Sequence, residues 1–131
     1  MNALYESMER ARPYVLSILR IVAALLFLEH GLSKVLGFPA AGPPLSGLLV
    51  VAAFLETVGA ALLLVGAYTR IVAFILSGEM ALAYFMAHQP RSFYPLVNGG
   101  DAAILFCFVF LYLAFAGGGP LSLDRAALHQ P

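Results

Sequence analysis

The sequence predicts an all-α integral membrane protein in which four helices form one bundle. Hydrophobic residues make up 62% of the 131 residues and charged residues only 11%, whereas soluble domains hold roughly 45–50% apolar and about 25% charged residues. The apolar residues gather in four stretches of about 20 residues, the length that crosses a hydrocarbon core of ~30 Å as a helix. None of these stretches shows the sustained alternation of apolar and polar residues that a membrane β-barrel requires.

Proline, glycine and short polar segments mark the ends of the four stretches. Pro13 suits the first position of a helix, and Gly66 suits the position directly after one. Thr69 is expected to cap the third helix. Asn98 is expected to cap the fourth, where Asp101 complements the positive end of the helix. These signals predict spans at residues 13–36, 45–66, 69–88 and 98–117.

The four spans are expected to form one domain, residues 13–118, between a cytoplasmic segment of residues 1–12 and a tail of residues 119–131. Basic residues are more numerous on the side of the N-terminus, which predicts that both termini are cytoplasmic. Arg20 lies near that side and can extend its long side chain to the interface, so a structural role is expected for it. The tail is expected to lie on the inner membrane surface as a short interfacial helix.

Each span carries one acidic residue, although a charge near the bilayer centre costs on the order of 3 kcal/mol or more. Counting 1.5 Å per residue places Glu56 and Glu79 at about the same depth, near the midplane. Small residues around Glu56, namely Ala53, Gly59 and Ala60, indicate a helix-packing face. Two carboxyl groups at one depth cannot both ionise cheaply, so at least one is expected to hold a proton. Proton exchange and hydrogen bonding between helices both remain open as roles.

A second polar group is expected towards the outer ends of the spans. His30 and Lys34 are i,i+4 neighbours and share one side of the first helix. Pairing of Lys34 with Asp101 or Glu29 at the rim is one interpretation, and proton exchange or ligand binding is the other. No pair of histidines has the i,i+4 spacing of a metal site, so no metal is expected. The outer cluster is predicted to comprise Glu29, His30, Lys34, His88 and Asp101.

Residue counts and missing motifs argue against several other functions. The seven basic and seven acidic residues balance, so no nucleic-acid partner is expected. Cys107 is the single cysteine, which excludes an internal disulfide and a dithiol redox pair. The phenylalanines around it are expected to face lipid, with part of a ligand wall as the alternative. Hydrolytic and nucleotide-binding motifs do not occur, so the sequence assigns no catalytic residue.

Four motifs, in order along nearly the whole chain, resemble the DoxX family of small bacterial membrane proteins. The motifs are Leu19-Arg20 leading to Phe27-x-x-His30-Gly31-x-x-Lys34, Glu56-x-x-Gly59-Ala60 leading to Gly66-x-x-Thr69-Arg70, Asn98-Gly99-Gly100, and Gly119-Pro120-Leu121-Ser122-Leu123-Asp124. The resemblance implies a four-helix inner-membrane protein whose recurrent polar positions are Arg20, His30, Lys34, Glu56 and Arg70. Many members of the family carry glutamate after Asn-Gly-Gly, where this chain has the shorter Asp101.

The resemblance also implies a role in a membrane redox system, because the family takes its name from a subunit of an archaeal thiosulfate:quinone oxidoreductase. The expected partners are the lipid bilayer, a quinone as bound ligand, and an oxidoreductase subunit that handles thiols or sulfur. Quinone reduction consumes protons, which buried carboxyl groups beside an apolar pocket can supply. The chain itself is expected to hold no cofactor. A non-catalytic subunit or scaffold and a small proton-coupled carrier are the alternatives, and assembly with further copies of the chain stays open.

Overall fold

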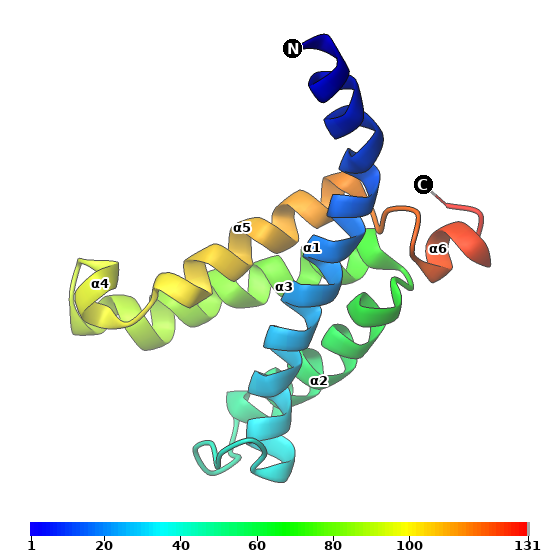
Figure 1. Cartoon of the computed structure of the whole chain (residues 1–131). Coiled ribbons are helices and arrows are strands. Elements are labelled where there is room, and N and C mark those ends of the chain that lie inside the picture. The colour runs from blue at the N-terminus through cyan, green and yellow to red at the C-terminus, as the bar shows by residue number, and fades with distance from the viewer. Residues whose placement is uncertain (131) are drawn as a thin grey trace.

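A computed structural model describes residues 1–130 of the chain. The protein is all-α, as the sequence predicts, and Figure 1 shows how its helices are arranged. The four main helices are α1 (Asn2–Leu36), α2 (Leu48–Val65), α3 (Thr69–Ala83) and α5 (Asp101–Ala116). The shorter elements are the π-helical turn η1 (Tyr84–His88), the 3-10 turn η2 (Gln89–Arg91), α4 (Pro95–Asn98) and α6 (Leu123–Ala126).

Within residues 1–130, three helical segments are long and apolar enough to cross a membrane. They are Asn2–Leu36, Leu48–Val65 and Thr69–Arg91, the last of which runs through α3, η1 and η2. Helix α5 is also apolar but has 16 residues, about 24 Å of helix at 1.5 Å per residue. Helix α5 is shorter than the span predicted at residues 98–117, because Asn98 belongs to the short helix α4 that precedes it.

Helix α1 begins well before the predicted span. Pro13 lies inside the helix and not at its first position, so the helix lacks one backbone hydrogen bond there. At 35 residues, α1 is about 52 Å long, whereas the hydrocarbon core is ~30 Å thick. The helix therefore has an N-terminal extension, residues 2–12, which is exposed and projects from the rest of the molecule (Figure 1).

The main helices form two antiparallel pairs, α1 with α2 and α3 with α5, which diverge from a common end (Figure 1). This closed end holds the turn between α2 and α3 together with the chain that follows α5. The opposite, open end holds the end of α1 and the segment from η1 to α4. The four-helix bundle is therefore a wedge, and this shape leaves space between the two pairs.

The hydrophobic core draws on all four main helices. Its largest apolar side chains include Phe27 of α1, Leu63 of α2, Leu76 of α3 and Phe110 of α5, each 0–1% exposed. Alanines fill the positions between these side chains, and small residues let membrane helices approach closely. The core therefore fixes the two pairs against each other.

The closed end is held by a latch, which we define as Ser17, Arg20, Gly118, Leu121 and Asp124. Arg20 is fully buried, so it has the predicted structural role, although its side chain contacts the tail and does not extend to the membrane interface. Its guanidinium donates from Nη1 to the carbonyl of Gly118 and from Nη2 to that of Leu121, the latter at 2.6 Å. These carbonyls are free because the chain leaves α5 and turns back over α1. Ser17 completes the contact by accepting from Leu121 N at 3.1 Å.

Asp124 caps α3 from a distant part of the chain. Its carboxylate accepts from Tyr68 N at 2.6 Å and from Thr69 N at 2.9 Å. Thr69 is thus the first residue of α3 and not its cap, because the residue before it, Tyr68, is left-handed and the tail supplies the acceptor. Asp124 is 2% exposed, so this part of the tail packs on the closed end of the molecule.

Helices α1 and α2 approach each other closely at Gly31. A Cβ atom there would lie 2.5 Å from Thr57 Oγ1 and 2.7 Å from Thr57 N. We expect Gly31→Ala to push the helices apart and to lower the free energy of unfolding by about 2 kcal/mol. Gly78 of α3 is the matched control, because no atom lies within 4 Å of its Cβ position.

The control substitution Gly78→Ala is expected to be neutral or to stabilise by up to about 1 kcal/mol, since alanine favours a helix over glycine. Thermal unfolding of both purified variants in detergent compares the two sites. Equal melting temperatures for the two variants would show that α1 and α2 are not packed as closely as described.

Candidate functional site

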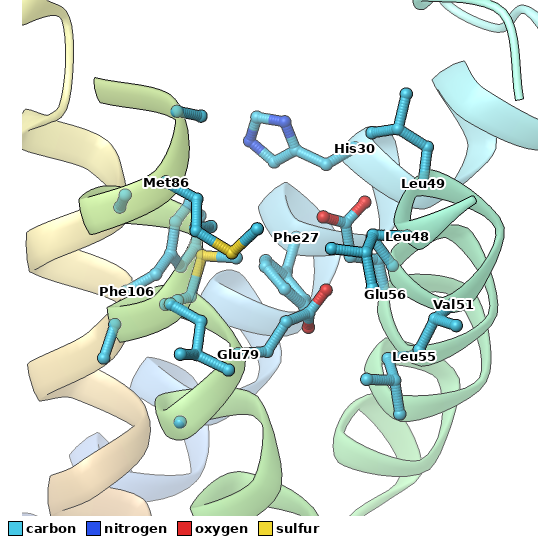
Figure 2. A pocket seen from close by; sticks show the side chains of 18 of the residues that line it. Phe27, His30, Leu48, Leu49, Val51, Leu55, Glu56, Glu79, Met86 and Phe106 are labelled. Atoms are coloured by element: carbon cyan, nitrogen blue, oxygen red, sulfur yellow. The ribbon is translucent and has the colours of Figure 1, made fainter. Parts of the chain in front are cut away.

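A cavity of about 1040 Å³ lies in the wedge between the two helix pairs (Figure 2). Its walls come from α1, from the first half of α2, from α3 with η1, and from the start of α5. The walls are mainly apolar, and several lining residues are more than half exposed: Leu48, Val51, Leu82 and Met86. The cavity is therefore open at its mouth, and its size is that of a site for a small organic ligand.

Lys34 and Glu56 form an ion pair on the α1–α2 side of the cavity. Lys34 Nζ lies 2.6 Å from Glu56 Oε2, and the two side chains are 16% and 7% exposed. The prediction that Lys34 pairs with Asp101 or Glu29 at the rim is wrong, because the long lysine side chain reaches inward to Glu56. The contact between Lys34 and Glu56 thus joins the predicted outer cluster to the predicted pair of glutamates near the midplane.

Glu79 faces this ion pair from α3. Figure 2 shows its carboxyl group pointing across the cavity towards Phe27 and Glu56. Both carboxyl oxygens are buried and have no hydrogen-bond partner among residues 1–130. An unpartnered buried carboxylate is costly, whereas a ligand that enters the cavity can supply the missing partner.

Aromatic side chains form the part of the wall between α1 and α5. The ring of Phe27 lies 5.2 Å from that of Phe106 and 4.9 Å from that of Phe110, between centroids. His30 packs edge-on against Phe106 at 5.8 Å. The prediction that the phenylalanines of this helix face lipid is wrong for Phe106 and Phe110, whereas Phe108 is 63% exposed.

The turn before α5 positions His88 at the open end. Asn98 is 1% exposed, and its Nδ2 donates to Tyr84 Oη at 3.2 Å and to Ser92 O at 2.9 Å. Its Oδ1 accepts from Gly100 N at 2.8 Å, so Asn98 holds the turn and does not cap α5 as predicted. His88 Nδ1 lies 3.2 Å from Asn98 O, and its ring stacks on Tyr84.

Five of the seven residues predicted for the site line this cavity: His30, Lys34, Glu56, Glu79 and His88. Glu29 and Asp101 are exposed and do not line it. Glu29 points elsewhere because successive residues of a helix are rotated by about 100°. Within residues 1–130, no three histidine, cysteine, aspartate or glutamate side chains lie close enough to hold a metal ion.

Two other polar positions of the family resemblance, Arg20 and Arg70, lie at the closed end. Arg70 Nη1 donates to the carbonyl of Phe115 at the end of α5. Sequence reasoning missed the capping role of Asp124, although the acid closes the last of the four motifs. It favoured lipid over the alternative of a ligand wall for Phe106, which lines the cavity, because a phenylalanine among apolar residues gives no sign of the side it faces.

Together these features define a multi-pass membrane protein with a ligand-sized cavity between two helix pairs. The family model of DoxX matches residues 15–89, a range that includes all five predicted residues of the cavity wall. An uncharacterized protein of Haemophilus influenzae is 45% identical over 130 aligned residues, which cover 91% of this chain and 95% of that protein. The chain belongs to the DoxX family. No solved structure matches the chain.

Proposed function

We propose that this DoxX protein binds a quinone in the cavity, as a component of a membrane redox system, and that the buried carboxyl groups handle the protons. The observation that carries the proposal is the unpartnered carboxyl group of Glu79 in the wall of an apolar, ligand-sized cavity. A quinone has apolar ring faces and carbonyl oxygens that accept hydrogen bonds. It also reaches a site between membrane helices through the lipid.

The two glutamates have different roles in this proposal. Glu56 is paired with Lys34 at 2.6 Å, so its carboxyl group already has a partner within the protein. Glu79 lacks such a partner, and its apolar wall accommodates the neutral acid better than the carboxylate. Glu79 therefore holds the exchangeable proton, and Lys34 supplies a further hydrogen-bond donor at the cavity wall.

The electrons come from a partner in this proposal. The residues of this chain include no dithiol pair, and quinone reduction needs two electrons with the two protons. An oxidoreductase subunit that handles thiols or sulfur, as in the complex that gave the family its name, is the proposed source. The protein then supplies binding, orientation and proton exchange for the ligand.

Titration of the purified protein in detergent with a short-chain quinone, followed by calorimetry, tests this function. We expect Glu79→Leu to weaken binding about tenfold, since one lost hydrogen bond to a ligand is worth roughly 1.4 kcal/mol. Glu29→Leu is the matched control, because it makes the same substitution at a glutamate that lies outside the cavity. Its affinity is expected to stay at the wild-type value.

Absence of quinone binding by the wild type, or equal losses in both variants, would contradict the proposed function. The first of these results would favour the non-catalytic subunit, in which the buried acids only hold helices together. Melting temperatures of the two variants, measured in the same detergent, separate a loss of affinity from a loss of folding.

A further inference from the structure

An exposed apolar seam runs along α1. It passes through Leu4, Met8, Ala11, Val15, Ile18 and Val22, all of them exposed. The spacing between successive members alternates between four and three residues and continues to Leu25 and then to Glu29. This alternation is the heptad repeat, which keeps one side of a helix facing another helix that wraps around it.

The seam lies opposite the side by which α1 packs on its own chain. The buried residues of α1 include Ser17, Arg20, Ala24 and Phe27, which fall between the seam positions. The helix thus already has one packed side, and the seam is a second apolar side that residues 1–130 of the same chain do not cover.

Lipid alone does not account for the seam. Helix α1 is about 52 Å long, and some 20 Å of it extends beyond a ~30 Å hydrocarbon core. Leu4 and Met8 lie in the N-terminal extension and are 66% and 63% exposed. The polar residues Glu6 and Arg10 occupy the other side of the extension. An apolar side that continues beyond the hydrocarbon core is removed from water when a second helix packs on it.

We propose that the seam is the interface of a homodimer, in which α1 of a second copy lies parallel to α1 of the first. Copies of one membrane protein insert with the same orientation, so a twofold axis along the membrane normal places like helices parallel. β-Branched residues at the first core position of the heptad, here Val15 and Val22, favour two parallel strands when leucine occupies the second, as Leu25 does. Ile18 and Leu25 occupy that second position.

Glu29 fits the same arrangement. It is exposed at the end of the seam, and an acid that faces lipid is unfavourable. In the parallel dimer Glu29 meets the same residue of the second copy, and the two carboxyl groups can share a hydrogen bond. A single polar residue at a core position also fixes the register of two helices. The dimer covers the side of α1 away from the cavity, so it does not depend on the proposed function.

Disulfide cross-linking in native membranes tests the interface. Single cysteines are placed at the seam as Leu4→Cys, Ala11→Cys or Leu25→Cys in a Cys107→Ala background. The controls on the other side of the extension are Glu6→Cys and Arg10→Cys. We expect about tenfold more cross-linked dimer at the seam positions, because only facing residues reach disulfide distance. Cross-links at both Leu4 and Leu25 identify a parallel dimer in register.

Equal cross-linking at seam and control positions, or cross-linking at the controls alone, would overturn the proposal. A second experiment measures the mass of the protein in detergent by light scattering. The wild type is expected to have twice the mass of one chain, and Leu4→Glu/Met8→Glu is expected to halve it. The matched pair Asn2→Glu/Arg10→Glu adds acids to the other side and is expected to stay dimeric. A single-chain mass for the wild type would exclude the dimer.

Discussion

Replacement of Arg20 by methionine is expected to lower the free energy of unfolding by about 3–5 kcal/mol, because it removes two hydrogen bonds of a buried charged group, each worth roughly 1.5–3 kcal/mol. The substitution leaves the partly buried carbonyl of Leu121 without its side-chain donor, and the buried carbonyl of Gly118 keeps only the hydroxyl of Ser17. Because the latch joins α1 to the chain after α5, its loss frees the closed end from which both helix pairs diverge.

Thermal unfolding in detergent measures this effect. Arg125→Met is the control, because Arg125 is exposed on α6 and its loss is expected to change stability by less than about 0.5 kcal/mol. A small effect of Arg20→Met would mean that the tail does not hold the closed end. Quinone affinity can be compared between the same two variants, because the latch lies at the end of the molecule opposite the mouth of the cavity.

Lys34→Met is expected to destabilise the protein by about 3 kcal/mol, because it leaves the carboxylate of Glu56 buried without its cation. Glu56 is 5% exposed, so water can replace little of the lost contact. The double variant Lys34→Met/Glu56→Leu removes both charges. It is expected to recover to within about 1 kcal/mol of the wild type, since apolar residues replace buried ion pairs at little cost.

A double-mutant cycle with Glu56→Leu as the other single variant gives the coupling energy of the pair. The exposed Arg91 provides the control Arg91→Met, for which no effect is expected. Additive losses in the double variant would show that Lys34 and Glu56 do not interact in the membrane. In that case the proposed division of roles between Glu56 and Glu79 would lose its basis.

The closed and open ends of the bundle have different roles. The latch and the core hold the helices at one end, whereas the ion pair, Glu79 and the two histidines surround a cavity towards the other. The wedge lets polar groups that are unfavourable in lipid face one another across a ligand-sized space. This arrangement explains how a mainly apolar chain accommodates buried acidic side chains.

The sequence alone indicated the class of the protein and the depth of its polar groups along the helices. Apolar stretches, with the prolines and glycines between them, predicted the helices because hydropathy and backbone preference are local properties. Counting residues along a helix also placed Glu56 and Glu79 at similar depths, and both line the cavity.

Only the tertiary structure decided which groups meet. Depth along one helix does not specify the side that faces a neighbour, so Lys34 was predicted to pair at the rim although it pairs with Glu56. The acceptor of Arg20 lies 98 residues away in the sequence, and the cap of Thr69 lies 55 residues away. Such contacts depend on how the helix pairs pack and how the tail returns, and no local pattern contains that information.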